Sequence, residues 1–184
     1  MIAFIRALVV CLSATVLFFP PALADEAQEK LLDQALAAYD EGDFEAARSI
    51  ILPLAHAEYP DAMNALGLMY HDGFVFLNDP EKGCDWFERA ANAGNPASMY
   101  NLSVCFNSGH GRPKNETQML RWRTMAAKNG STNAMINLSS RDKTEGEEYR
   151  YWMKMAADHG STYAKVSLWL QDYEDDVAWC MTAR

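Results

Sequence analysis

Three segments of this chain repeat one pattern of a tryptophan, a pair of alanines and a glycine. They read WFERAANAGNP at 86–96, WRTMAAKNGST at 122–132 and WMKMAADHGST at 152–162. The tryptophans, the alanine pairs and the glycines all keep the same two steps, of 36 and then 30 residues. A catalytic motif is normally needed once, whereas a fixed spacing of about 20 to 50 residues is typical of stacked structural repeats. The pattern therefore predicts a repeat architecture.

Each repeat is predicted to form two helices. The first half carries a leucine that is followed by a small residue, as in Leu66-Gly67, Leu102-Ser103 and Leu138-Ser139, and Leu168 continues the series. Neighbouring apolar residues recur at three and four residues, which is the spacing of one helical face. In the second half the alanine pairs favour a close helix crossing, because larger side chains would push the axes apart. We expect an all-α fold, an α-solenoid of antiparallel helix pairs.

Turn signals fall at the expected helix ends. Gly94, Gly130 and Gly160 are suited to the left-handed conformation that closes a helix. Side chains able to cap the next helix follow these glycines or open the second helices, at Asn95, Ser131, Ser161, Asp79 and Asn115. In the shortened third repeat, Thr144 and Glu147 have the spacing of a capping box.

The repeat period divides the chain into six parts. We assign 1–24 to a leader, 25–60 to an N-terminal helical hairpin, 61–96 and 97–132 to full repeats, 133–162 to a shortened repeat and 163–184 to C-terminal capping helices. The third repeat loses its six residues between Ser140 and Tyr149. Because this loop is absent, we expect the stack to be irregular there.

The first 24 residues have the pattern of a cleaved secretory signal. One basic residue, Arg6, precedes an apolar run from Ala7 to Phe19, and Ala22-Leu23-Ala24 fits the small-x-small cleavage rule. An uncleaved membrane anchor is the alternative, but the run is short and Pro20-Pro21 interrupts it. We therefore expect a periplasmic or secreted protein with no membrane insertion after cleavage.

Charge narrows the class of partner. Without Arg6 the chain has 15 Lys and Arg against 25 Asp and Glu, a net charge of −10. Nucleic acids and anionic membrane surfaces bind basic faces, so this balance argues against both. A solvated acidic surface is the simpler reading, and we expect a monomer.

The segment ALGLMYHDGFVFLNDPEKGCDWFERAANAG at 65–94 resembles a Sel1-like repeat, a relative of the tetratricopeptide repeat. The family pattern is matched by Leu66, Gly67, Tyr70, Gly73, Asp79, Lys82, Trp86, Ala90, Ala91 and Gly94. The chain departs from it at Val75, at Gly83 and in the lost third loop, and the resemblance covers about 61–170. It implies an exported scaffold for protein–protein interaction, an adaptor or regulator in the cell envelope, with no cofactor and no common catalytic apparatus.

Three cysteines follow the leader, and two of them are placed to pair. Cys84 and Cys105 flank the turn at Gly94-Asn95 almost symmetrically, so an antiparallel hairpin brings them to the same height. An oxidising compartment permits the disulfide. The alternative is that Cys105 is a small core residue. Cys180 is then the odd cysteine, buried or open to a partner.

Catalytic and metal motifs are weak. The four histidines, at 56, 71, 110 and 159, lack metal-ligand spacing, so we expect no metal site. Ser140 and Lys143 match S-x-x-K, but no S-D-N or K-T-G element follows. We expect no enzyme. The alternatives are a secreted hydrolase or small-molecule binder of the cysteine-rich penicillin-binding repeat type, and a host-directed secreted effector.

A protein or peptide partner is expected on the concave face, the inner surface made by the first helices. Its residues vary between repeats while the packing positions recur: Asn64, Leu68, His71, Tyr100, Val104, Asn107, Ile136 and Ser140. Tyr100 is the candidate hot spot, because aromatic side chains near an interface centre dominate affinity. The alternative is that neighbouring helices cover Leu68, Val104 and Ile136.

Overall fold

The computed structural model describes residues 21–73, 78–140 and 146–182. Within these ranges the chain forms nine helices and no strand. In chain order the helices are α1 (Pro21–Asp40), α2 (Phe44–His56), α3 (Pro60–Asp72), α4 (Pro80–Asn92), α5 (Pro96–Ser108), α6 (Glu116–Lys128), α7 (Thr132–Ser139), α8 (Glu147–Asp158) and α9 (Thr162–Thr182).

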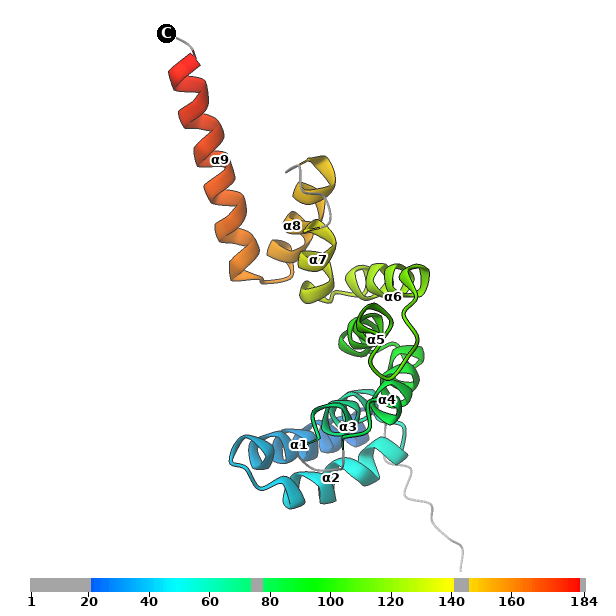
Figure 1. The fold of residues 1–184 in the computed structure, drawn as a ribbon. Coiled ribbons are helices and arrows are strands. Elements are labelled where there is room, and N and C mark those ends of the chain that lie inside the picture. The colour runs from blue at the N-terminus through cyan, green and yellow to red at the C-terminus, as the bar shows by residue number, and fades with distance from the viewer. Residues whose placement is uncertain (1–20, 74–77, 141–145, 183–184) are drawn as a thin grey trace, which may run out of the picture.

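The helices stack into a curved solenoid (Figure 1). Each helix packs mainly against the helices before and after it in the chain, and the most extensive packing joins α3 to α4 and α5 to α6. Figure 1 shows α5 and α7 on the inner side of the curve and α4 and α6 on the outer side. The predicted all-α solenoid is confirmed, with the first helices lining the concave face.

Turn chemistry fixes the helix ends as the sequence predicted. Gly94, Gly130 and Gly160 have φ angles of 96°, 98° and 93°, which side chains other than glycine rarely adopt. The five predicted capping side chains each accept a hydrogen bond from the backbone N–H three residues on: Asp79, Asn95, Asn115, Ser131 and Ser161. These bonds satisfy N–H groups that a helix start leaves without partners.

The core consists of two apolar clusters that meet at α4. One cluster lies among α1, α2 and α3 and takes Ala90 from α4, while the other runs from α4 to α9 and includes Phe87 and Ala91. The small residue after the repeated leucine lies at the helix crossing. A Cβ atom at Gly67 would lie 2.6 Å from the ring of Phe87, so this crossing has no room for a side chain.

The C-terminal part corrects one prediction. We expected short capping helices at 163–184, but α9 is a single helix from Thr162 to Thr182. The physical reason is that no glycine, proline or asparagine occurs between these residues to end it.

The starts of α1 and α8 bear on two further expectations from the sequence. Helix α1 begins at Pro21, ahead of the expected cleavage point after Ala24. The capping box at Thr144 lies outside the described residues, and the N-cap of α8 is Gly146, which makes no side-chain cap bond. None of the described helices is long and apolar enough to cross a bilayer.

Candidate functional site

The concave face is lined by α3, α5 and α7, and its side chains differ in exposure. Leu68 is 40% exposed, and Asn107 and Ser140 are exposed as well. Tyr100, Val104 and Ile136 are half-buried, and Tyr100 and Ile136 pack against the core. The alternative that neighbouring helices cover Leu68, Val104 and Ile136 therefore holds in part for Val104 and Ile136, which are half-buried, and does not hold for Leu68.

Polar side chains connect neighbouring first helices along the concave face. Asn64 Oδ1 accepts hydrogen bonds from Ser98 Oγ at 2.8 Å and from Asn101 Nδ2 at 3.0 Å. One repeat further on, Asn137 Nδ2 donates to Tyr100 Oη at 3.1 Å. Each bond joins one repeat to the next, so part of the hydrogen-bonding capacity of Asn64 and Tyr100 is used inside the protein. The Nδ2 atom of Asn64 takes no part in these bonds.

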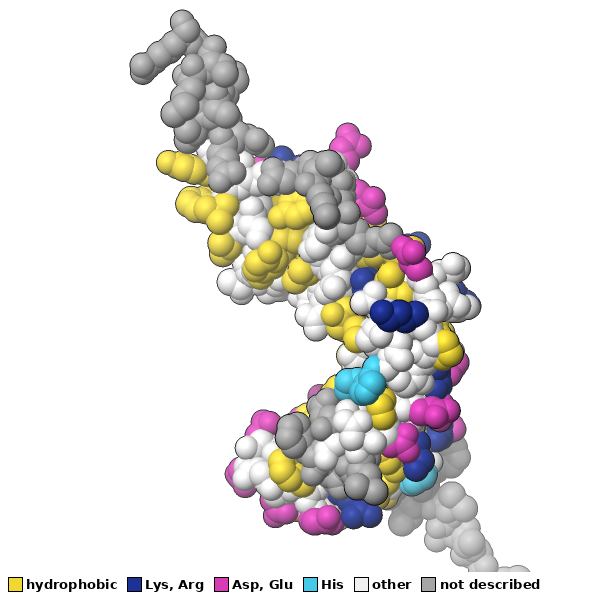
Figure 2. Space-filling view, viewed as in Figure 1, with side chains coloured by type: hydrophobic (Ala, Val, Ile, Leu, Met, Phe, Trp, Pro, Cys, Tyr) yellow, Lys and Arg dark blue, Asp and Glu magenta, His cyan; other side chains and the backbone are white. Residues whose placement is uncertain are grey.

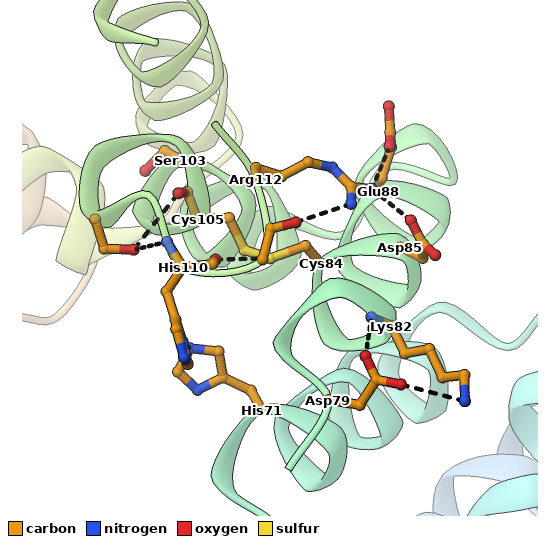
Figure 3. Close-up of a disulfide and its surroundings, with 12 residues drawn as sticks. His71, Asp79, Lys82, Cys84, Asp85, Glu88, Ser103, Cys105, His110 and Arg112 are labelled. Carbon is orange, nitrogen blue, oxygen red and sulfur yellow. Dashed lines mark hydrogen bonds and ion pairs between the residues drawn. A yellow bond between two sulfur atoms is a disulfide. The ribbon is translucent and has the colours of Figure 1, made fainter. Parts of the chain in front are cut away.

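The disulfide predicted between Cys84 and Cys105 is present and joins α4 to α5 (Figure 3). The two Cα atoms are 6.3 Å apart, within the usual range for a disulfide, and both residues are buried. Because α4 closes one repeat and α5 opens the next, the bond links two units of the solenoid. It therefore holds α4 and α5 together near the middle of the solenoid.

The loop after α5 lies against α4 next to the disulfide. Gly111 has a φ of 78°, and a Cβ atom there would lie 2.2 Å from the carbonyl oxygen of Pro80, so only glycine permits this approach. Beyond it, Arg112 forms ion pairs with Asp85 and Glu88 of α4. Partial burial works against the charge of Arg112, but its hydrogen bonds to Asp85 and Glu88 outweigh this and raise its pKa.

This loop brings two histidines together on the concave face. Figure 3 shows His71, from the last turn of α3, pointing toward His110, and the His71 Nε2 and His110 Nδ1 atoms are 3.4 Å apart. In Figure 2 histidine atoms lie where the molecule is hollowed. A hydrogen bond between the two rings needs an N–H group on one ring and an unprotonated nitrogen on the other. It therefore cannot form when both rings are protonated. Among the described residues no group of three or more His, Cys, Asp or Glu side chains gathers as a metal site would require.

An apolar pocket of about 110 Å³ adjoins the N-terminal end of the concave face. It lies between α1, α2 and α3, and its lining includes the exposed side chains of Leu36 and Leu68. A pocket of this size has room for one small apolar group.

Sequence reasoning found the inner helices but missed how their side chains pair. The bonded pairs Asn64–Asn101 and Tyr100–Asn137 are each 37 residues apart, one more than the repeat. This spacing was available as a signal, because Asn101 and Asn137 share a repeat position. The His71–His110 pair is 39 residues apart and follows from the path of the loop, which the repeat does not specify.

Two solved structures of bacterial proteins have a similar architecture. A Sel1 repeat protein from Oxalobacter formigenes superposes with a TM-score of 0.65 at 24% identity, covering 72% of this chain and 57% of that one. A protective antigen present in uropathogenic Escherichia coli strains, which displays an SLR fold, gives a TM-score of 0.63 at 23% identity, covering 78% and 34%. The chain thus spans between a third and three fifths of the length of these two proteins, and the likeness concerns the fold.

The family comparison identifies the repeats themselves. The Sel1 repeat model matches residues 60–95, 96–131 and 150–161, that is, α3–α4, α5–α6 and most of α8. Proteins of this family are in general non-catalytic scaffolds that mediate protein–protein interaction. These matches and the observed helix pairs show that the chain carries Sel1 repeats at these three positions.

Proposed function

We propose that this protein is an exported scaffold, an adaptor or regulator of the cell envelope, that binds a protein or peptide partner along its concave face. The observation that carries the proposal is the composition of that face. It combines an exposed apolar side chain beside a small apolar pocket, at Leu68 of α3, with polar side chains on the next inner helix, α5, at Asn107 and Tyr100. Such a surface can hold an apolar anchor and hydrogen-bond an extended backbone.

Export rests on the leader pattern and on the disulfide. The buried Cys84–Cys105 bond suits an oxidising compartment, because cytosolic thiols are kept reduced. The acidic balance of the chain favours a partner that is not itself strongly acidic. We place the protein in the periplasm or outside the cell.

Site-specific photo-crosslinking tests the proposal. A benzophenone amino acid replaces Asn107, which is exposed on the concave face near the end of α5. The matched control carries it at Lys128, which is exposed near the end of α6 on the outer side. After irradiation of intact cells and fractionation of the envelope and medium, we expect one defined protein adduct at position 107 and none at 128.

Two results would contradict the proposal. Equal adducts at both positions would show that the concave face is not the binding surface. Capture of the protein in the cytosol, with Cys84 and Cys105 as free thiols, would remove the exported role.

A further inference from the structure

The side of α9 that faces away from α8 is apolar and uncovered. Five of its side chains are between 47% and 64% exposed, and they follow one another at three-residue steps except for the adjacent Trp169 and Leu170: Tyr163, Val166, Trp169, Leu170 and Tyr173. The opposite side, which carries the buried Ala164, packs on α8. In Figure 2 hydrophobic atoms gather along this outward side of the helix. We call these five residues the α9 face.

The position of α9 in the repeat explains why no second helix, of the kind that completes the other repeats, packs on this face. Leu168 continues the series of repeated leucines, so Trp169 holds the position of Gly67, Ser103 and Ser139. At Gly67 that position is where the second helix of the unit crosses, with no room for a Cβ atom. A tryptophan there, 64% exposed, cannot pack against a second helix as the other units do.

We propose that the α9 face binds the α9 face of a second copy of this chain, with the two helices antiparallel and the two-fold axis near Leu168. Tyr163, Val166, Leu170 and Tyr173 have the three–four–three spacing of a coiled-coil seam. In this register Tyr163 lies opposite Tyr173 of the second copy, and Val166 lies opposite Leu170. The concave positions of α3 and α5 stay open, so the dimer does not depend on the proposed function.

The uncovered area suits a dimer. Together the exposed fractions of the five side chains amount to on the order of 700 Å² per copy, against about 800 Å² per partner in a standard interface. Aromatic side chains form most of this area, and they are enriched at the centres of interfaces. The face is therefore large enough for a reversible dimer, in place of the monomer expected from the sequence.

Charge on one flank of α9 favours the antiparallel direction over the parallel one. Lys165 and Asp172 are both exposed and lie seven residues apart, on the same side of the helix beside Trp169. A two-fold axis near Leu168 brings Lys165 of each copy to within one residue of the height of Asp172 of the other, and both lie outside the seam, so these opposite charges attract at a distance. Asp172 also forms an ion pair with Arg150 of α8, so its charge is partly balanced within the chain. A parallel arrangement would place Lys165 opposite Lys165 and Asp172 opposite Asp172.

Sedimentation equilibrium of the purified full chain tests the dimer, with a matched pair of variants. Tyr173→Ala removes a side chain that is 58% exposed on the α9 face, and Tyr151→Ala removes one that is 56% exposed on α8. We expect a monomer–dimer equilibrium at micromolar concentrations in the native chain. Tyr173→Ala should raise the dimer Kd at least tenfold, whereas Tyr151→Ala should leave it within twofold.

Charge reversal tests the direction of pairing. Lys165→Glu should weaken the dimer, and the double variant Lys165→Glu with Asp172→Lys should recover at least half of that loss. A monomer at all concentrations would overturn the proposal, as would a dimer that Tyr173→Ala leaves intact. A dimer that the double variant weakens further than the single one would overturn the antiparallel register.

Discussion

Removing the Cys84–Cys105 disulfide should destabilise the middle of the solenoid by an amount that the structure allows us to work out. The bond closes a loop with a sequence separation of 21, from α4 across the Gly94 turn to α5. A cross-link over such a loop restricts the unfolded chain by about 3 kcal/mol on the loop-entropy model. For a chain of this length, about 3 kcal/mol corresponds to a fall in Tm of about 6 to 12 °C.

The assay is urea and thermal unfolding followed by circular dichroism on three samples: the native chain, the native chain with a reductant, and the double variant Cys84→Ala with Cys105→Ala. The reduced native chain keeps both sulfurs in the core and so isolates the cross-link. The double variant should lose at least as much stability, because it also removes buried sulfur atoms. Cys180→Ser leaves the disulfide intact and serves as the matched control.

A reduced native chain that unfolds at the same urea concentration as the oxidised one would refute this reasoning. So would a stability loss for Cys180→Ser equal to that of the double variant. A split transition in the double variant alone would support the role of the bond as a link between units, since repeats then unfold separately.

Three further predictions follow from the same contacts. Gly67→Ala should destabilise the chain by about 1–3 kcal/mol in urea unfolding, because the added Cβ meets the ring of Phe87. An unchanged free energy of unfolding would contradict the close α3–α4 crossing. The hydrogen bond from the backbone N–H of Lys82 lowers the pKa of Asp79, so an NMR titration of the side-chain carboxyl should give a pKa below the usual value for aspartate. A lowered folded pKa means that this cap stabilises the fold above about pH 4 and is lost as the pH falls. In hydrogen exchange the second half of α9 should exchange faster than α3 to α6, and the reverse order would contradict a solenoid that is weakest at this end.

The sequence predicted those parts of the fold that recur with the period. Local chemistry repeats from unit to unit, so the caps at Asn95 and Ser131 and the left-handed glycines could be placed without knowing the tertiary structure. The Cys84–Cys105 bond could be predicted as well, because the two cysteines lie at similar distances on either side of one turn.

Features outside the period could not be predicted in the same way. The His71–His110 contact depends on how Gly111 lets the loop approach α4, and that is a tertiary constraint on one residue. The unbroken α9 was missed because the repeat pattern suggested a turn where no breaker residue exists. The partner-binding role of the concave residues stays a prediction.

One correction changes how that prediction is tested. Tyr100 packs against the core, and its hydroxyl accepts a hydrogen bond from Asn137. Tyr100→Ala should therefore lower the stability of the protein as well as its affinity, so Tyr100 is not a binding residue alone. Binding has to be measured well below the Tm of the variant.

The affinity of the captured partner for concave-face variants tests the central claim most directly. Isothermal titration calorimetry at 15 °C would compare the native chain with Tyr100→Ala and with Tyr151→Ala, a tyrosine variant on α8 outside the concave face. Loss of an interface hot spot costs about 1–3 kcal/mol, which raises the Kd by roughly 5- to 150-fold. We predict this change for Tyr100→Ala and less than a twofold change for Tyr151→Ala. An unaltered Kd for a folded Tyr100→Ala protein, or an equal loss in both variants, would contradict binding at the concave face.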